Sequence, residues 1–196
     1  MILKNADYIL VNSYRGYDFL NKYLKREIFY LSEYINESYL NININYNDKK
    51  NIVVYNPKKG YKFTLKIIKK MKNITFIPII NMNRNEVINL LKTAKVYIDF
   101  GNHPGKDRLP REAASLYCCI ITGTRGSAGN DKDVPIPNKY KFEDKKKNIK
   151  YIINTIYNCI NNYNYNINDF EFYRNYVRNE KYIFEQSIDS IFKKES

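Results

Sequence analysis

The densest group of chemically active side chains in this sequence lies in one segment, Gly101 to Glu112, directly after an apolar run. It contains the only histidine of the chain, His103, and its cations are Lys106, Arg108 and Arg111. Such cations can surround a diphosphate, and Glu112 can accept hydrogen bonds from ribose hydroxyls. His103 can act as an acid or base, or donate to a phosphate or sugar hydroxyl. The alternative is structural, with these charges capping a helix and pairing with each other.

Two further polar segments follow apolar runs. The turn Asn56–Gly60 enters a helix and offers backbone amides and two ammonium groups, Lys58 and Lys59, to an anion. The segment Thr122–Gly129 offers small residues and one guanidinium, so that backbone amides can approach a ligand. It matches neither the Walker A pattern nor GxGxxG. An ordinary lysine-bearing surface turn remains the alternative for the first segment.

The pattern between these segments alternates strands with helices. Strands are expected at 52–55, 74–79, 95–100 and 118–122, and helices at 61–71, 83–94 and 110–117. This alternation predicts βαβ units and a parallel sheet, hence an α/β fold. The ligand crevice of an open parallel sheet lies beyond the carboxyl ends of its strands, where the three polar segments fall.

The ends of the chain are less regular. A strand at 7–13 and a helix at 15–24 come first, and 27–36 fits a strand turning into a helix. The Asn-rich stretch 41–50 is interpreted as a surface connection. Residues 123–138 are expected to form a loop, and two helices, at about 143–163 and 167–193, to finish the chain.

Composition indicates an ordinary globular protein with one main domain. Hydrophobic residues make up 44% of the 196 residues and charged residues 27%. The three cysteines, Cys118, Cys119 and Cys159, are expected to be buried free thiols rather than a disulfide framework or a zinc cluster. No apolar run approaches a membrane span, and residues 1–6 lack the apolar stretch of a secretory signal. We therefore expect a cytoplasmic location.

The formal net charge of +13 attracts polyanions, phosphorylated ligands and anionic lipid surfaces without choosing among them. With 20 tyrosines, it also suggests a basic nucleic-acid-binding protein, although many tyrosines fall at helical spacing that favours packing. The lysine-rich stretch 145–150 suggests peripheral contact with the inner face of a membrane, against the alternative of a solvated helix face.

The three polar segments, in this order and after successive strands, resemble the C-terminal, donor-binding domain of GT-B type glycosyltransferases of the group 1, family 4-like kind. NPKKG stands where such proteins carry a Lys-Gly pair that opens a helix. GKDRLPREAASLYCCIITG is similar to their glycine-rich loop and helix with Leu-Pro and Glu-Ala, followed by a strand and a Gly/Thr/Ser loop. The resemblance implies a Rossmann-like parallel sheet flanked by helices, with long C-terminal helices.

The same resemblance implies a site for a nucleotide-diphosphate sugar, with no cofactor and no metal ion. Lys58 and Lys59 would face the diphosphate, Glu112 would hold the ribose, and loop 122–127 would lie close to the phosphates. The expected donor-binding residues are Lys58, Lys59, Gly101, Gly105, Arg111, Glu112, Thr122, Gly123, Arg125, Gly126 and Ser127. The candidate catalytic residues are His103, Lys106 and Arg108, with cations assisting departure of the nucleotide diphosphate.

Residues 1–50 are then expected to be a remnant of an N-terminal acceptor domain with its linker, and residues 51–196 the donor-binding domain. The function implied is glycosyl transfer to a saccharide or lipid-linked acceptor in polysaccharide biosynthesis. Many retaining members carry a second glutamate eight positions before the ribose-binding one, where this chain has Pro104. The alternatives are a noncatalytic nucleotide- or phosphate-binding module and a subunit whose partner chain supplies the acceptor site.

Overall fold

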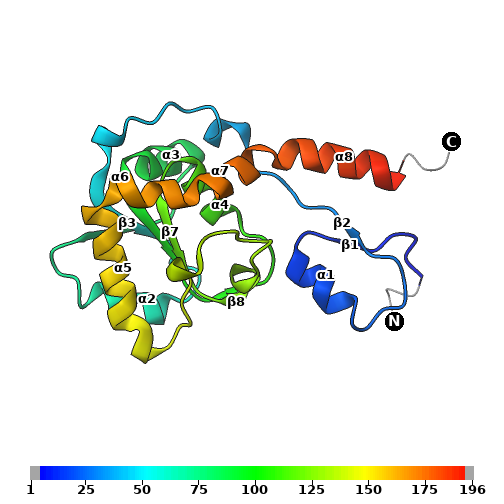
Figure 1. The fold of residues 1–196 in the computed structure, drawn as a ribbon, viewed down its shortest axis with the longest axis horizontal. Helices are drawn as coiled ribbons and strands as arrows, with labels where there is room; N and C mark the ends of the chain where they lie inside the picture. The colour runs from blue at the N-terminus through cyan, green and yellow to red at the C-terminus, as the bar shows by residue number, and fades with distance from the viewer. Residues whose placement is uncertain (1–4, 193–196) are drawn as a thin grey trace.

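A four-stranded parallel sheet forms the centre of the computed structural model, which describes residues 5–192 (Figure 1). Its strands are β3 (Lys50–Tyr55), β4 (Thr75–Pro78), β5 (Ala94–Asp99) and β7 (Cys119–Thr122), in the order β4-β3-β5-β7. All three pairings are parallel. The predicted α/β fold with a parallel sheet is therefore confirmed, and each expected strand of this region is present within two residues.

Helices connect these strands in the predicted order. They are α2 (Tyr61–Ile68), α3 (Arg84–Thr93) and α4 (Arg108–Ser115). Helix α3 begins with a capping box, in which the Asn83 side chain accepts from the Glu86 amide and the Glu86 carboxylate from the Asn83 amide. The central sheet strands and these helices bury a continuous apolar core that includes Val53, Val96 and Ile120.

The C-terminal third is helical, as predicted, but more divided than expected. Helix α5 (Ile149–Asn161) follows a single 3₁₀ turn, and α6 (Tyr163–Asn166) occupies the expected break. The single helix expected at 167–193 is instead a 3₁₀ turn at Ile167–Phe170, then α7 (Glu171–Arg178) and α8 (Glu180–Phe192). The chain turns at Asn179, and Glu180 is thereby buried against α4. Residue 193, the last of that prediction, lies outside the described residues.

The N-terminal segment forms a small unit beside the main sheet, and Figure 1 shows it next to the far end of α8. It consists of β1 (Leu10–Val11), α1 (Tyr14–Leu20) and β2 (Phe29–Tyr30), with β1 and β2 parallel. Its strands are shorter than the sequence pattern suggested. The segment is joined to the rest by Asp133, whose carboxylate accepts the amides of Tyr14 and Arg15 at 2.7 and 3.0 Å.

The Asn-rich connection 41–50 leading into β3 was expected to lie on the surface, but one of its residues is buried. Lys49 is only 6% exposed, and its ammonium donates to the carbonyl oxygens of Leu91, Ala94 and Leu116 at 2.9, 2.9 and 2.6 Å. These carbonyls lie at the C-terminal ends of α3 and α4, where backbone acceptors lack helical partners. Burial lowers the pKa of the Lys49 ammonium. An Asn-rich sequence gives no sign of this role.

The cysteine and membrane-span predictions agree with the structure. Cys118, Cys119 and Cys159 are all buried free thiols. Among the described residues, no helix has both the length and the apolar character needed to cross a membrane.

Candidate functional site at the carboxyl edge of the sheet

Three loops meet at the carboxyl edge of the sheet, and each follows one of its strands. They are the turn 56–60 after β3, the loop 100–107 after β5, and the loop 123–130 after β7. Two short parallel strands, β6 (Asn102–His103) and β8 (Arg125–Gly126), tie the second loop to the third. The polar segments singled out from the sequence therefore converge, as a parallel sheet requires.

Glycines allow these loops to approach so closely. Gly60 has φ of +56°, and a Cβ there would lie 2.4 Å from the carbonyl oxygen of Phe100. Gly101, with φ of +109°, packs back against Gly60. Gly123 donates its amide to the carbonyl oxygen of Asp99 at 2.9 Å. The backbone amides at this edge are thus gathered around a junction that has no room for side chains.

Lys58 and Lys59 lie in the turn that opens α2. Lys58 is exposed, and its amide donates to the Asn56 side chain at 3.0 Å, which shapes the turn. Lys59 is half-buried, and its ammonium forms an ion pair with Asp107, the N-cap residue of α4. Lys58 is therefore open to a ligand, whereas a ligand of Lys59 must share its ammonium with a carboxylate.

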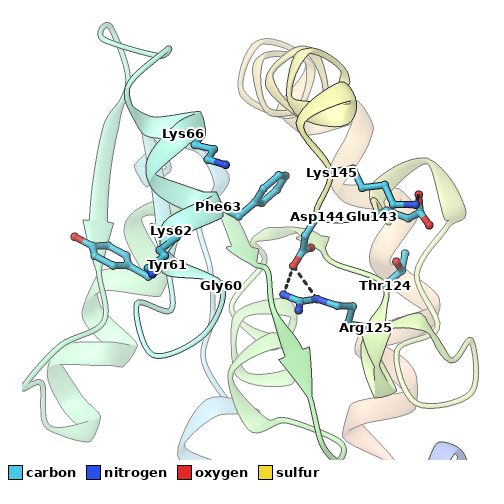
Figure 2. Close-up of a pocket in the computed structure, with 10 residues that line it drawn as sticks. All are labelled: Gly60, Tyr61, Lys62, Phe63, Lys66, Thr124, Arg125, Glu143, Asp144 and Lys145. Carbon is cyan, nitrogen blue, oxygen red and sulfur yellow. Dashed lines mark hydrogen bonds and ion pairs between the residues drawn. The ribbon is translucent and has the colours of Figure 1, made fainter.

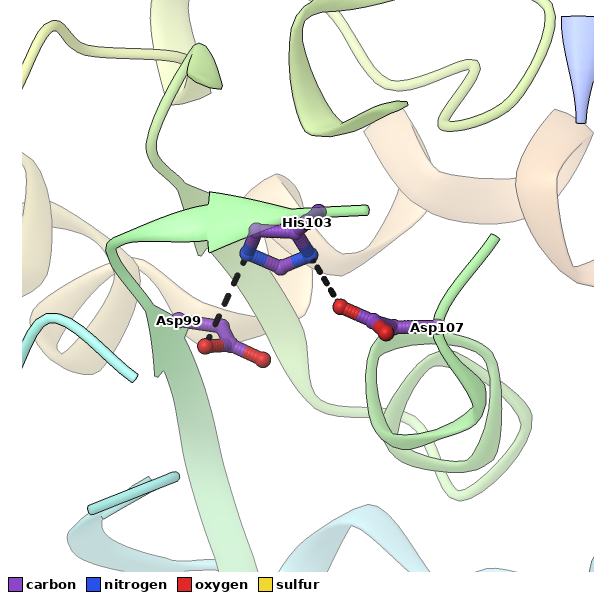
Figure 3. A group of neighbouring side chains, drawn as sticks. All are labelled: Asp99, His103 and Asp107. Atoms are coloured by element: carbon purple, nitrogen blue, oxygen red, sulfur yellow. Dashed lines mark ion pairs between the residues drawn. The ribbon is translucent and has the colours of Figure 1, made fainter. Parts of the chain in front are cut away.

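Asp107 also belongs to a cluster with two buried residues, His103 and Asp99 (Figure 3). The Nδ1 atom of His103 lies 2.6 Å from Oδ2 of Asp107, and Nε2 lies 3.7 Å from Oδ1 of Asp99. His103 is 1% exposed, so its ring has no open path to a substrate in this conformation. Its expected catalytic role stays a prediction.

The pKa values of the two carboxyl groups in this cluster, Asp99 and Asp107, are shifted in opposite directions. Burial raises the pKa of Asp99 to about 6, although His103, the Tyr97 hydroxyl and Lys59 counteract it, while the charge of Asp107 adds to the rise. Burial also acts to raise the pKa of Asp107, but hydrogen bonds from His103 and Lys59 outweigh it and lower that pKa. Asp107 is the ionised member, and Asp99 holds a proton more readily.

Arg108 and Glu112 lie one turn apart on α4 and form the second part of the edge. Arg108 is exposed, and Glu112 is 7% exposed. Burial raises the pKa of the Glu112 carboxyl, against Arg108, Arg111 and a hydrogen bond from Tyr39. Tyr39 comes from the 3₁₀ turn Glu37–Tyr39 in the N-terminal connection. Sequence reasoning missed Tyr39 because nothing local relates it to α4.

The two remaining cations of the segment 101–112, Lys106 and Arg111, face away from this edge. The Lys106 ammonium is 2.6 Å from a Glu180 oxygen and donates to the Tyr176 hydroxyl at 2.9 Å. The Arg111 guanidinium donates to Glu180 at 2.9 Å and to the carbonyl oxygen of Glu33 at 2.8 Å. Lys106 is 3% and Arg111 0% exposed. In this conformation both are held by Glu180, and their donor or catalytic roles stay predictions.

The third loop supplies one exposed cation and two buried hydroxyls. Arg125 donates from Nε and one terminal nitrogen to the same Asp144 oxygen, at 3.1 and 2.7 Å. Thr122 and Ser127 each bury a hydroxyl that has no hydrogen-bond partner among the described residues. Gly126 has φ of +72° and packs on the backbone of His103. Gly105 lies in the neighbouring loop, close to the Asn12 side chain.

A cavity of about 780 Å³ adjoins these loops on the side of α2 (Figure 2). Its lining is Gly60, Tyr61, Lys62, Phe63, Lys66, Thr124, Arg125, Glu143, Asp144 and Lys145. It shares Gly60, Thr124 and Arg125 with the three loops. Lys62, Lys66 and the first turn of α2, which carries no acidic residue, suit an anion, whereas Arg125 and Lys145 of the lining are paired with Asp144 and Glu143.

The sequence Asp131-Lys132-Asp133 follows directly after the third loop, and such paired aspartates are candidate metal ligands. The structure uses them otherwise. Asp133 caps α1, and Asp131 accepts from the Lys141 ammonium at 2.7 Å. Among the described residues, the Asp99, His103 and Asp107 cluster is the group of three whose ligand atoms lie within 4.8 Å of one another.

The sheet order, its loops and its flanking helices match the GT-B glycosyltransferase fold. The chain is similar to two crystal structures of TarM. The first, a point mutant of S. aureus TarM in complex with fondaparinux, alpha-GlcNAc-glycerol and UDP, has a TM-score of 0.72 at 15% identity, over 97% of this chain and 44% of that one. The second has a TM-score of 0.71 at 14% identity, over 97% and 43%.

The chain thus spans less than half the length of either TarM structure. At this identity the likeness shows the fold alone. No family model matches the chain, and no curated protein matches it.

Proposed function

We propose that this chain binds a nucleotide-diphosphate sugar and takes part in glycosyl transfer, as a GT-B donor-binding domain. The observation that carries the proposal is the meeting of three glycine-lined loops with Lys58, Lys59, Arg108 and Glu112 at the carboxyl edge of the sheet. Such an edge is where α/β sheets bind nucleotides. The GT-B fold and the UDP in the TarM complex support this choice of ligand.

In this proposal the diphosphate lies at the 56–60 turn and the glycine junction, facing backbone amides and the Lys58 and Lys59 ammonium groups. Glu112 holds the ribose hydroxyls, and Arg108 neutralises charge on the departing diphosphate. Tyr39, which already donates to Glu112, must share or yield that carboxylate when a ribose binds. The acceptor is a saccharide or lipid-linked saccharide, and an additional domain or partner chain supplies its site.

Nucleotide binding tests this proposal. Calorimetric titration with UDP, GDP, ADP and CMP should give one-site binding for one of them. The Lys59→Ala and Glu112→Ala variants should each bind that nucleotide about tenfold more weakly, because each loses one charged hydrogen-bonding group.

Lys92→Ala on the outside of α3 is the matched control and should leave the affinity unchanged. Circular dichroism must show that all variants are folded. Absence of binding for every nucleotide would contradict donor binding by this chain alone and favour the partner-dependent subunit.

A second surface supports a proposal about membranes. A groove of about 610 Å³ between α2 and α5 is lined by five lysines and two isoleucines: Lys66, Lys70, Lys146, Lys147, Lys150, Ile149 and Ile153. In the described part of the chain, none of these five ammonium groups lies within ion-pair distance of a carboxylate, whereas neighbouring Lys145 pairs with Glu143. We propose that this groove rests on an anionic lipid surface.

Vesicle binding tests the groove. Replacing Lys147 and Lys150 together with alanine should weaken binding to phosphatidylglycerol vesicles by about 1 kcal/mol for each lysine removed. Replacing the exposed Lys22 and Lys25 of the N-terminal segment together is the charge-matched control. Sedimentation with phosphatidylglycerol vesicles, and with phosphatidylcholine vesicles, measures how tightly each of the two double variants binds. An equal loss in the two double variants would show that only net charge matters.

A further inference from the structure

Four side chains, in which acidic and basic residues alternate, form a row between the interior and the α2 turn. Asp99 ends β5, His103 lies in β6, Asp107 caps α4, and Lys59 stands in the turn before α2. His103 sits between the two carboxylates, 2.6 Å from Asp107 and 3.7 Å from Asp99 (Figure 3). Lys59 also pairs with Asp107. The row therefore connects a buried histidine to a lysine of the proposed diphosphate site.

The contacts fix where one proton lies. Asp107 is ionised and accepts from two donors, so the Nδ1 atom of His103, at 2.6 Å, carries a hydrogen. A free neutral imidazole can carry its proton on either nitrogen, and here the choice is made by Asp107. The same contact orients the ring.

The other end of the row has two polar atoms facing each other without a partner. Nε2 of His103 and Oδ1 of Asp99 are both buried, 3.7 Å apart, and neither makes a hydrogen bond among the described residues. If both were bare acceptors, the burial of two unsatisfied atoms would be costly. A proton on Nε2 would make this contact an ion pair with the Asp99 carboxylate at 3.7 Å, a distance too long for a hydrogen bond. Asp99 then balances the imidazole, while its second oxygen accepts from the Tyr97 hydroxyl at 2.8 Å.

A metal ion fits this row less well. Asp107 and Lys59 occupy the Nδ1 side of the ring, so only Nε2 and one Asp99 oxygen face the gap. Structural zinc sites use four protein ligands and catalytic ones three. A cation here would also lie near the Lys59 ammonium.

We infer that His103 is a positioning residue: with Asp99 behind it, it holds the Asp107 carboxylate, which in turn holds the Lys59 ammonium where a donor diphosphate binds. The part that concerns Lys59 rests on the proposed function. His103 does not touch the donor in this arrangement. It acts by fixing the carboxylate that would otherwise rotate with Lys59 when an anion arrives.

Nitrogen-15 NMR of the imidazole tests the row directly. The chain has one histidine, so the two ring-nitrogen signals belong to His103 and only Nδ1 and Nε2 must be told apart. In the wild-type protein treated with EDTA, the Nδ1 signal should be that of a protonated nitrogen, because Nδ1 faces the Asp107 carboxylate at 2.6 Å. A bare Nδ1 with a proton on Nε2 would overturn the inference. So would a shift of the Nε2 signal on addition of equimolar Zn²⁺, which would mark a metal site.

A pair of variants then tests positioning. The amide nitrogen of an asparagine stands near the place of Nδ1, and that of a glutamine near the place of Nε2. His103→Asn can therefore still donate to Asp107, whereas His103→Gln cannot. His103→Gln should weaken nucleotide binding about tenfold, and His103→Asn should restore most of the affinity at equal folded stability. Equal affinity of both variants and the wild type would overturn the inference.

The two proposals fail differently. If Lys59→Ala binds the nucleotide as tightly as the wild type, the diphosphate role of Lys59 is wrong, and the NMR experiment still decides the Nδ1 proton. If Lys59→Ala weakens binding and His103→Gln does not, the proposed function survives and the positioning role is wrong.

Discussion

Replacing Glu180 with alanine is expected to lower the free energy of unfolding by about 3–5 kcal/mol, the usual cost of breaking a buried ion pair from one side. Glu180 is 3% exposed. One carboxylate oxygen lies 2.6 Å from the Lys106 ammonium, as an ion pair rather than an aligned hydrogen bond. The other accepts from Arg111 at 2.9 Å. The substitution would leave two buried cations facing each other, and burial together with Arg111 already acts to lower the pKa of Lys106.

Denaturant unfolding followed by circular dichroism measures this effect. Glu185→Ala, an exposed glutamate on the same helix, is the matched control and should change stability by less than about 0.5 kcal/mol. Adding Arg111→Met to Glu180→Ala should cost less than the sum of the two single changes, because one of the two cations that lose Glu180 is gone; among the described residues, Arg111 otherwise keeps only its ion pair with Glu33 at 3.2 Å. Additive losses would show that Glu180 and Arg111 do not interact in solution.

This ion cluster also shows what the sequence could not reveal. Lys106 and Arg111 stand beside His103 and Arg108 in the chain, and the sequence predicted a common site for all four. Their partner, Glu180, is 69 residues beyond Arg111, and no local pattern connects them. The cluster joins α4 to the start of α8, so its charges contribute to how the C-terminal helix is attached.

The parallel sheet, by contrast, was predictable because each of its βαβ units is local in sequence. Strands and helices between residues 50 and 122 follow from apolar periodicity, and their carboxyl ends must share one edge. That reasoning correctly brought the 56–60, 101–107 and 122–127 loops together. It could not supply Tyr39 or Lys49, whose positions are set by an irregular connection that packs across the sheet.

Replacing Gly126 with alanine is expected to lower the free energy of unfolding by about 3 kcal/mol and to weaken nucleotide binding as well. Gly126 has φ of +72°, which L side chains rarely adopt, and an added Cβ would lie 1.9 Å from the carbonyl oxygen of His103. That oxygen belongs to the backbone of β6, so no side-chain rotation relieves the contact. β6 and β8 would have to separate, and the loop carrying His103 and Asp107 would move with them.

Gly105→Ala is the control within the same site. Gly105 has no positive φ, and its added Cβ would first meet the side chain of Asn12, at 3.1 Å, which can move. Its variant should therefore remain within about 1 kcal/mol of the wild type and keep the imidazole NMR signals. Gly126→Ala should shift those signals, since His103 pairs directly with residue 126. A Gly126→Ala protein with wild-type stability and an unshifted His103 would mean that the β6–β8 pairing is not what holds the two loops together, and the junction would then depend on Gly60, Gly101 and Gly123.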